Sequence, residues 1–129
     1  MREVVLDTET TGLSPEEGHR IIEIGCLELI NHLPSGRKFH SYLNPDRDIP
    51  AEATAIHGLA RKDLLGQPSF ADQVASFMSF IGDDKLIIHN ASFDLGFLNA
   101  ELDRLNLSLI EPDRAVDTLI LARQKFPGA

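Results

Sequence analysis

The segment Val4-Val5-Leu6-Asp7-Thr8-Glu9-Thr10-Thr11-Gly12 determines both the predicted fold and the predicted chemistry of this chain. It begins with a short, β-branched apolar run, which is typical of a buried strand. Asp7 and Glu9 stand two positions apart at the end of that strand, so both carboxylates point to the same side. Two hard oxygen ligands at this spacing suit Mg²⁺ or Mn²⁺. The alternative is that they are solvated acids at a strand end.

A second segment, Leu86-Ile87-Ile88-His89-Asn90-Ala91-Ser92-Phe93-Asp94, has a related organisation. An apolar strand runs directly into the first turn of a helix that carries Asp94. If the two strands are neighbours, Asp94 reaches the same edge of the sheet as Asp7 and Glu9. Two metals held there could clamp the attacking and leaving oxygens of a phosphodiester. The alternative for Asp94 alone is a favourable charge near a helix N-terminus.

The remaining sequence predicts one α/β domain with the element order β-β-β-α-β-α-α. Three strands with short connections indicate an antiparallel meander, and a strand after the first helices can join it in parallel. The expected fold is a mixed sheet flanked by helices. The expected elements are a loop at 10–18, strands at 20–30 and 39–43, a hairpin connection at 31–37, a loop at 44–50, short helices within 51–65, a helix capped by Ser69, a strand at 86–88, a helix capped by Asn90 or Ser92, and a helix at 117–125 ended by Pro127-Gly128.

Composition and charge exclude several classes of protein. No apolar run approaches the roughly 20 residues of a membrane span, and the N-terminus lacks a signal-peptide pattern. The single cysteine, Cys26, excludes an internal disulfide and a cysteine zinc site, which favours a cytoplasmic protein. The net charge of −8 argues against a protein that grips duplex DNA over many phosphates. It fits a protein that binds metal, or a subunit that a partner holds on nucleic acid.

The two carboxylate segments resemble the first and second motifs of the DEDDh family of 3′→5′ exonucleases. The similarity continues through residues 18–25, 39–45, 56–59 and 116–118, and is greatest to the proofreading epsilon subunits of bacterial DNA polymerase III. This resemblance implies a ribonuclease-H-like fold and release of nucleoside monophosphates from a DNA 3′ end. It also implies two Mg²⁺ or Mn²⁺ ions per complete site, held by the catalytic residues Asp7, Glu9 and Asp94.

The resemblance further implies a set of substrate-binding residues. Glu52 and His57 match positions that contact the terminal nucleotide in the family, although a histidine before a glycine turn is often only a loop residue. Phe93 is expected beside the nucleotides, with core packing as its alternative. Asn90 and Asp117 are expected either to orient the site or to cap helices. The full substrate-binding set is Asp7, Glu9, Thr10, Thr11, Gly12, Leu13, Glu52, His57 and Phe93.

The family also has a third motif, in which a general-base histidine precedes an aspartate by five positions. Here only His89 has an aspartate at that distance, and this is Asp94 of the second motif. We therefore expect residues 1–129 to form a C-terminally truncated exonuclease domain, with the general-base histidine beyond Ala129. Weak or absent nuclease activity, a partly built metal site and an exposed apolar patch on one sheet face follow from this expectation.

The resemblance implies three partners: a single-stranded or frayed DNA 3′ end, the polymerase catalytic subunit and a small accessory subunit. Three alternatives stay open. The chain could be a non-catalytic binding module for accessory subunits, or an RNA-trimming exonuclease of the same fold. The third is a phosphatase of the haloacid-dehalogenase type, which the first motif resembles faintly. That family has a second aspartate where Glu9 stands here.

Overall fold

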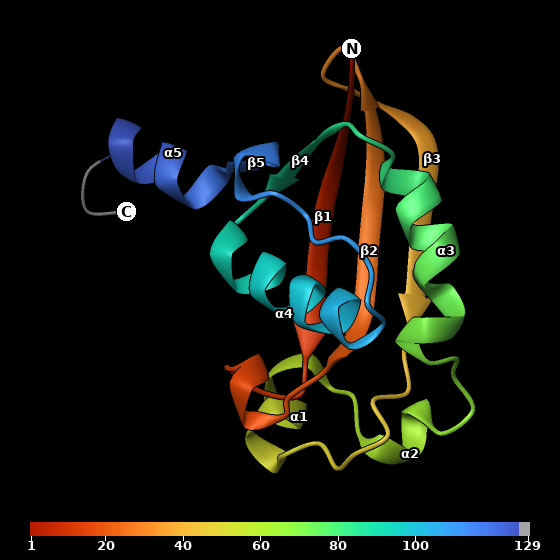
Figure 1. Cartoon of the computed structure of the whole chain (residues 1–129). Helices are drawn as coiled ribbons and strands as arrows, with labels where there is room; N and C mark the ends of the chain where they lie inside the picture. Colours follow the sequence, from red (N-terminus) through yellow and green to blue (C-terminus); the bar gives the residue numbers. More distant parts are fainter. Residues whose placement is uncertain (127–129) are drawn as a thin grey trace.

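A computed structural model describes residues 1–126 and contains one mixed five-stranded sheet with the strand order β3-β2-β1-β4-β5. The first three strands are antiparallel, whereas β4 pairs with β1 in parallel and β5 pairs with β4 in parallel. The sheet and its flanking helices match the predicted ribonuclease-H-like class (Figure 1). The strands are β1 (Arg2–Thr10), β2 (Ile21–Ile30), β3 (Leu33–Tyr42), β4 (Lys85–Ile88) and β5 (Ala115–Asp117).

Within residues 1–126, seven helical segments connect and flank these strands. Figure 1 shows α3 and α4 against the sheet, α1 and α2 gathered at one end, and α5 projecting beyond β5. The end of α5 predicted at Pro127-Gly128 lies outside the described residues. The segments are the 3-10 turns η1 (Pro15–Glu17) and η2 (Pro112–Arg114), and the helices α1 (Ala51–His57), α2 (Arg61–Leu64), α3 (Phe70–Ile81), α4 (Ala91–Arg104) and α5 (Thr118–Lys125).

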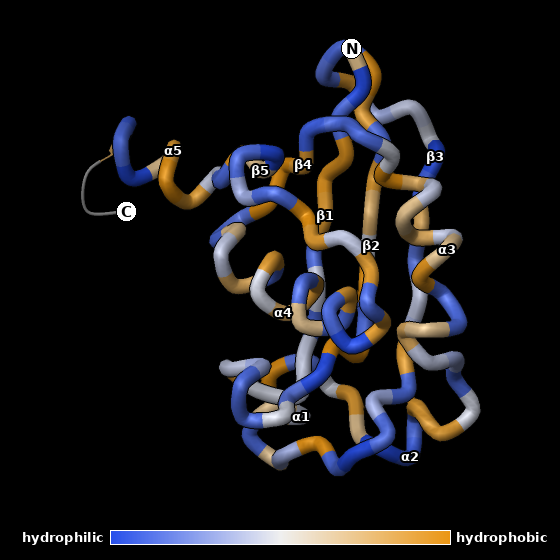
Figure 2. Tube along the Cα trace, viewed as in Figure 1, coloured by the Kyte–Doolittle hydropathy of each residue, from blue (hydrophilic) through white to orange (hydrophobic). Residues whose placement is uncertain are grey.

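One face of the sheet packs against α3 and α4 and forms the core. Apolar residues recur at helical spacing along both helices, as predicted, and meet alternate residues of the strands. Figure 2 shows hydrophobic segments along β1 and β2. Ser69 caps α3 as predicted, because its hydroxyl accepts from the Asp72 N–H at 3.1 Å. The buried core includes Val4, Leu6, Ile24, Cys26, Phe70, Phe77, Ile81, Leu86, Ile88, Phe97, Leu98 and Leu102.

The opposite face, which we call the open face, carries Val5, Asp7 and Glu9 of β1 and the residues of β2 that pair with them. Leu27 of β2 pairs with Val5 on this face. Its side chain is 50% exposed, even though β2 is an interior strand of the sheet. An exposed apolar side chain on an interior strand indicates that little covers this face. The two expected metal ligands of β1 are therefore on the face that lies away from the core.

Two details of the sheet differ from the sequence prediction. The hairpin between β2 and β3 turns at Asn31 and His32, which both have positive φ, so the predicted connection at 31–37 is wrong. Pro34 lies within β3 instead, because β3 is an edge strand and an edge strand tolerates a missing N–H. The three-residue strand β5 was not predicted, since it is too short for periodicity and exists through its pairing with β4.

Cys26 lies in the core at 2% exposure, in register with Leu6 of β1 and Phe39 of β3. Burial disfavours the charged thiolate and raises the pKa of Cys26 to about 12. The thiol is thus a protonated core group. Within residues 1–126, no helix has the length and apolar character needed to cross a membrane.

Candidate active site

Asp7 and Glu9 follow the alternation expected of β1. Thr8 between them is buried on the core face, whereas Asp7 is exposed and Glu9 half-buried. Gly25 pairs with Asp7 across the sheet, and a Cβ at Gly25 would meet nothing within 4 Å. Space is therefore open beside the Asp7 carboxylate. The prediction that Asp7 and Glu9 share one side of the strand agrees with this register.

Asp94 lies in the first turn of α4 and is only 4% exposed. Its Oδ1 accepts a hydrogen bond from the Thr8 hydroxyl at 2.6 Å. Burial raises the pKa of Asp94 to about 6, the Thr8 hydrogen bond opposes the shift, and the charges of Asp7 and Glu9 add to it. Asp94 is thus a buried acid that feels the other two carboxylates and has no cation beside it among the described residues.

Glu9 has a similar electrostatic character. Burial raises the pKa of Glu9, and the negative charges of Asp7 and Glu23 raise it further. Glu23 is its register partner on β2 and explains part of this crowding. His57 acts in the opposite direction, which places the imidazole within electrostatic reach of the Glu9 carboxylate.

The donor atoms fit a hard divalent cation, while the arrangement is not a closed ligand cage. Carboxylate oxygens are the ligands that Mg²⁺ and Mn²⁺ prefer, and the mutual repulsion of the three acids would be relieved by a cation. Within residues 1–126, no group of three or more His, Cys, Asp or Glu residues is placed to hold a metal ion. The reason is visible in the fold, because Asp94 bonds to Thr8 on the core face while Asp7 and Glu9 point to the open face.

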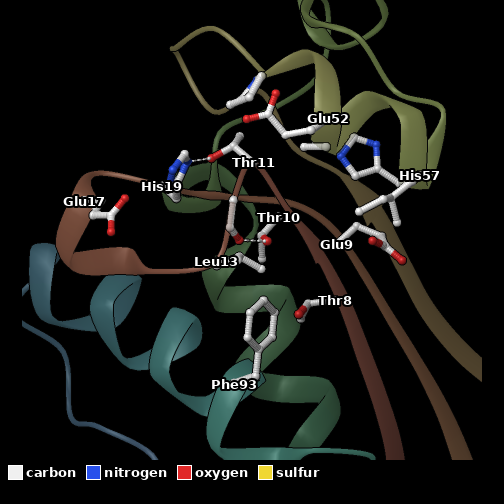
Figure 3. A pocket seen from close by; sticks show the side chains of 14 residues that line it. Thr8, Glu9, Thr10, Thr11, Leu13, Glu17, His19, Glu52, His57 and Phe93 are labelled. Atoms are coloured by element: carbon white, nitrogen blue, oxygen red, sulfur yellow. Dashed lines mark hydrogen bonds between the residues drawn. The ribbon is translucent and has the colours of Figure 1, made fainter.

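A cavity of about 490 Å³ adjoins these carboxylates (Figure 3). It is large enough for a small-molecule ligand such as a nucleotide. Neither Asp7 nor Asp94 lines this cavity, and Asp7 instead lines a smaller hollow with Glu23 and Gly25. The predicted residues that line the large cavity are Glu9, Thr10, Thr11, Gly12, Leu13, Glu52, His57 and Phe93. Sequence reasoning missed Thr8, Glu17, His19, Pro50, Ala53 and Ile56.

His57 lies at the C-terminal end of α1, and only one of its two ring nitrogens, Nδ1, has a hydrogen-bond partner among the described residues. Its Nδ1 accepts from the Leu59 N–H at 3.0 Å, in a turn that Gly58 allows through a φ of 78°. Its Nε2 is buried and is the one buried side-chain polar atom among the described residues without a hydrogen-bond partner. A buried N–H without a hydrogen-bond partner costs free energy, and a ligand that accepts from this N–H would recover that free energy.

The turn after β1 forms the floor of the cavity and is fixed by its own hydrogen bonds. The Thr10 hydroxyl donates to the Gly12 carbonyl at 2.6 Å. Thr11 is fully buried, and its N–H donates to the Arg20 carbonyl at 2.9 Å. Leu13 extends from this rigid turn at 86% exposure, so its side chain is available to a ligand.

Two further predicted residues lie around the cavity. Phe93 packs against the core and against Phe97 at a ring separation of 5.1 Å, yet it also borders the cavity. Core packing of Phe93 is therefore observed, and its position beside the nucleotides stays a prediction that its place at the cavity permits. Glu52 lies in the first turn of α1, and its exposed carboxylate borders the same space.

Asp117 was expected either to orient the site or to cap a helix, and its hydrogen bonds show helix capping. Its carboxylate accepts from the N–H groups of Asn90 and Ala91 at 3.0 and 2.9 Å, and from the Leu119 N–H at 2.9 Å. Asp117 thus caps the beginnings of α4 and α5 together. The predicted side-chain capping by Asn90 or Ser92 is wrong, because Asn90 adopts a left-handed conformation and makes no cap bond, while Ser92 already lies inside α4.

Comparison with known proteins reveals clear relatives among DNA polymerase III epsilon subunits. The chain is 51% identical over 132 residues to that subunit of Rickettsia felis, covering 100% of this chain and 58% of the relative. It is 46% identical over 134 residues to that of Salmonella typhimurium, covering 98% and 55%. For Escherichia coli the identity is 43% over 134 residues, covering 98% and 55%. The chain spans a little over half the length of these relatives.

Solved structures share the fold. Exonuclease X in complex with 5′ overhanging duplex DNA superposes with a TM-score of 0.75 at 28% identity, over 98% of this chain and 65% of that one. E. coli Exonuclease I in complex with a dT13 oligonucleotide gives a TM-score of 0.84 at 16% identity, over 97% and 29%, which shows the fold alone. The sequence also matches the family described as "Exonuclease" over residues 4–129. This chain therefore belongs to the exonuclease family.

Proposed function

We propose that residues 1–129 are the part of a 3′→5′ DNA exonuclease domain that binds the terminal nucleotide, and that the whole protein proofreads for a replicative polymerase. One observation carries this proposal. Glu9, whose pKa is raised by burial and by the charge of Asp7, lines a nucleotide-sized cavity together with the unsatisfied Nε2 of His57, and the buried Asp94 lies in the field of Asp7 and Glu9. Epsilon relatives at 43–51% identity support the polymerase assignment.

Each carboxylate has a proposed role. Asp7, Glu9 and Asp94 would hold two Mg²⁺ or Mn²⁺ ions, which when bound supply a Lewis acid for the scissile phosphate and for the attacking water. The Thr8 hydroxyl donates to Asp94 Oδ1 at 2.6 Å, so an ion would bind the other oxygen, Oδ2, or displace this hydroxyl. The raised pKa of Asp94 means that its ionised form is costly without a cation, so metal binding and ionisation favour each other.

The cavity residues would hold the 3′-terminal nucleotide. Its phosphate belongs at the carboxylates, and the sugar beside Glu9 and Glu52, which offer acceptors to a hydroxyl. The rigid turn at Thr10–Leu13 and the ring of Phe93 give the sugar and base an apolar support. A single-stranded or frayed end fits such a site, and mismatched ends fray more readily. The net charge of −8 fits a subunit that the polymerase holds on DNA.

The general base is the part of the machinery for which residues 1–129 supply no candidate. His89 alone stands five positions before an aspartate, and its Nδ1 lies 3.0 Å from the Thr118 hydroxyl. We propose that the base belongs to helices outside residues 1–129. The chain alone should then bind metal and nucleotide but hydrolyse DNA slowly or not at all.

The test is calorimetric titration of Mn²⁺ in the presence of thymidine 5′-monophosphate. The unaltered chain should bind, while Asp7→Asn and Asp94→Asn should lose at least tenfold in affinity, because each removes an anionic ligand. Glu16→Gln is the matched control, since Glu16 is an exposed acid of the neighbouring 3-10 turn that does not line the cavity. No binding by any variant would overturn the proposal for this chain and favour the non-catalytic binding module.

A nuclease assay complements the titration. With Mn²⁺, a single-stranded DNA labelled at its 5′ end should shorten slowly from the 3′ end, and Asp7→Asn should abolish the shortening. An RNA of the same sequence should be degraded more slowly than the DNA. Faster degradation of the RNA would transfer the assignment to an RNA-trimming exonuclease.

A further inference from the structure

The cavity contains a second histidine that the sequence motifs do not single out. His19 lies just before β2 and lines the cavity together with the turn at Thr10–Leu13 and with Glu17. Figure 3 shows His19 and His57 on different sides of the cavity, on separate elements. His57 is within electrostatic reach of Glu9, whereas His19 contributes to the pKa of neither Glu9 nor Asp94. His19 therefore lies on the side of the cavity away from Glu9, the one expected metal ligand that lines it.

Local hydrogen bonds determine which nitrogen of His19 carries the hydrogen. The Thr11 hydroxyl is fully buried and accepts from the Arg20 N–H at 3.0 Å. Its own hydrogen has one acceptor within reach among the described residues, the His19 Nδ1 at 2.9 Å. Because Nδ1 accepts, the hydrogen of a neutral ring resides on Nε2. His19 thus presents an N–H donor, and its Nε2 has no partner within residues 1–126.

His57 has the same arrangement by a different route. Its Nδ1 accepts from the Leu59 N–H, so its Nε2 also carries the hydrogen. That nitrogen is buried and unpartnered. The cavity therefore has two imidazole donors, each with its tautomer set by a backbone or hydroxyl group behind it, and one of the two stands at each end.

The ring of His19 is also fixed in place. A Cβ added to Gly12 would lie 2.4 Å from its Cδ2, Cε1 and Nε2 atoms, so the ring rests directly against the Gly12 backbone. Thr11 holds one edge of the ring, and Gly12 leaves room for its face. Such fixation is what a binding residue requires, since a preorganised donor loses little entropy on binding.

We propose that His19 is a substrate-binding residue whose Nε2–H donates to an acceptor atom on the edge of the 3′-terminal nucleobase. This inference rests on the proposed function, because a phosphate anchored at Asp7, Glu9 and Asp94 directs the base toward the remote end of the cavity. Every nucleobase carries carbonyl or ring-nitrogen acceptors. One fixed donor therefore holds any terminal base without selecting among them, as a proofreading site needs.

Two substitutions separate the binding role from a structural one. His19→Gln places its amide nitrogen near the position of Nε2, so it keeps the donor and loses the bond to Thr11. His19→Asn places its amide near the position of Nδ1, so it keeps a partner for Thr11 and loses the donor. The same pair at His57 provides the matched control at the other end of the cavity.

The experiment is calorimetry in MnCl₂ with two ligands, thymidine 5′-monophosphate and 2-deoxyribose 5-phosphate, which lacks the base. His19→Asn should weaken binding of the nucleotide about tenfold, as loss of one hydrogen bond predicts, and leave the sugar phosphate unchanged. His19→Gln should retain most of the affinity for the nucleotide. His57→Asn should weaken both ligands, because its donor lies at the carboxylate end.

The results that would overturn the role of His19 differ from the result that would also overturn the proposed function. Full nucleotide affinity in His19→Asn, or an equal loss for both ligands, would overturn the role of His19 and leave the proposed function intact. Failure of the unaltered chain to bind either ligand would overturn both. A long-range ¹H–¹⁵N spectrum of the imidazoles gives a test that does not depend on binding. It should show the Nε2–H form of His19, and the Nδ1–H form would refute the inference.

Discussion

Two buried carboxylates lie seven residues apart on α4, and their surroundings are opposite. Glu101 is 2% exposed and accepts two hydrogen bonds from Arg20, at 2.8 and 2.6 Å, with Arg104 at 3.2 Å. Asp94 is 4% exposed and accepts from a neutral hydroxyl, in the field of Asp7 and Glu9. The spacing puts both acids on the same side of the helix.

The difference separates a charge that the fold compensates from one that it does not. The charge of Glu101 is compensated inside the fold, and its bridge to Arg20 fastens α4 to the segment that enters β2. The charge of Asp94 is left without compensation, which costs free energy that the fold itself does not recover. Buried acids with strongly raised pKa values cluster at functional sites. The comparison therefore predicts that removal of the Glu101 charge lowers the free energy of unfolding, whereas removal of the Asp94 charge raises it.

The largest effect is expected at Glu101. Glu101→Leu leaves the Arg20 guanidinium partly buried without its partner and should lower the free energy of unfolding by about 3 kcal/mol. The double variant Arg20→Met/Glu101→Leu replaces the pair by apolar groups and should lower it by only about 1 kcal/mol. Urea denaturation at pH 7.5 measures both values. A double variant as unstable as the single one would show that the pair does not act as a unit.

The next effect has the opposite sign. Asp94→Asn removes an uncompensated charge and should stabilise the metal-free chain by about 3 kcal/mol at pH 7.5, because burial raises the pKa of Asp94 to about 6. Because the folded pKa is raised, the native state binds the extra proton and is favoured at low pH. The stability of the unaltered chain relative to Asp94→Asn should fall as the pH rises from about 4 to about 6.

Glu101→Gln is the control for this prediction, because it also neutralises a buried acid of α4 but should lose stability. Denaturant unfolding at pH 4.5, 5.5 and 7.5 makes the comparison. A stability difference between Asp94→Asn and the unaltered chain that does not change with pH would show that Asp94 has an ordinary pKa.

Mn²⁺ should reduce the stability difference between the unaltered chain and Asp94→Asn. At ten times its Kd, the ion should stabilise the unaltered chain by about 1.4 kcal/mol, since a ligand that binds only the folded state adds its binding free energy. Asp94→Asn and Asp7→Asn should lose most of this gain, whereas Glu101→Gln should keep it. Thermal unfolding with and without MnCl₂ measures the shift. Equal shifts in all four proteins would place the ion elsewhere.

The smallest effect is expected from the Thr8 hydroxyl, which donates a hydrogen bond to Asp94 where no cation is present among the described residues. Thr8→Val removes the hydrogen bond that opposes the effect of burial, so the pKa of Asp94 should move further above 6. Carboxyl ¹³C chemical shifts followed through a pH titration report this value directly. An unchanged or lower pKa would show that the Thr8 bond contributes nothing to the charge balance at Asp94.

Local patterns predicted part of the carboxylate arrangement. Alternation along β1 predicted the shared side of Asp7 and Glu9, and the strand-to-helix boundary predicted the approach of Asp94. Each of these inferences needs only neighbouring residues and the pairing of two strands. The hydrogen bond between Thr8 and Asp94, which divides the carboxylates between two faces, depends on side-chain packing and has no signature in the sequence.

The long-range contacts were not predictable for the same reason. Arg20 and Glu101 are 81 positions apart, and nothing in either surrounding segment marks them as partners. The place of His19 in the cavity was missed because it depends on contacts with Thr11 and Gly12, and the sequence does not show which side chain packs against that turn. The one available signal was the glycine, since a residue without Cβ often marks a close approach.

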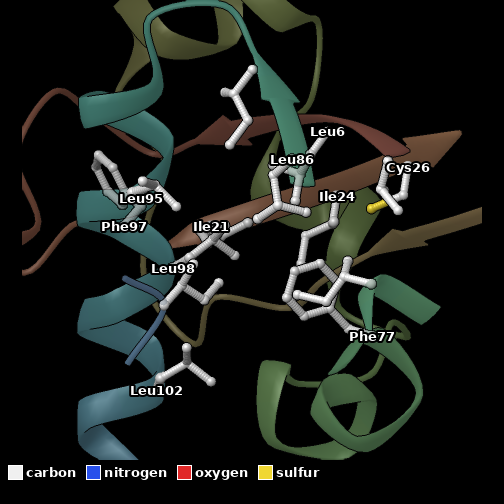
Figure 4. Close-up of a cluster of buried hydrophobic side chains, with 14 of the residues drawn as sticks. Leu6, Ile21, Ile24, Cys26, Phe77, Leu86, Leu95, Phe97, Leu98 and Leu102 are labelled. Carbon is white, nitrogen blue, oxygen red and sulfur yellow. The ribbon is translucent and has the colours of Figure 1, made fainter. Parts of the chain in front are cut away.

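The buried position of Cys26 makes its thiol a probe for opening of the core. The only thiol of the sequence lies among Leu6, Ile24 and Phe77 in the core (Figure 4). With a pKa of about 12, it is uncharged at neutral pH, and an alkylating reagent reaches it only when the core opens. The rate of alkylation therefore reports the frequency of opening. One reagent can thus rank the α4 variants on a common time scale, without denaturant and with metal present or absent.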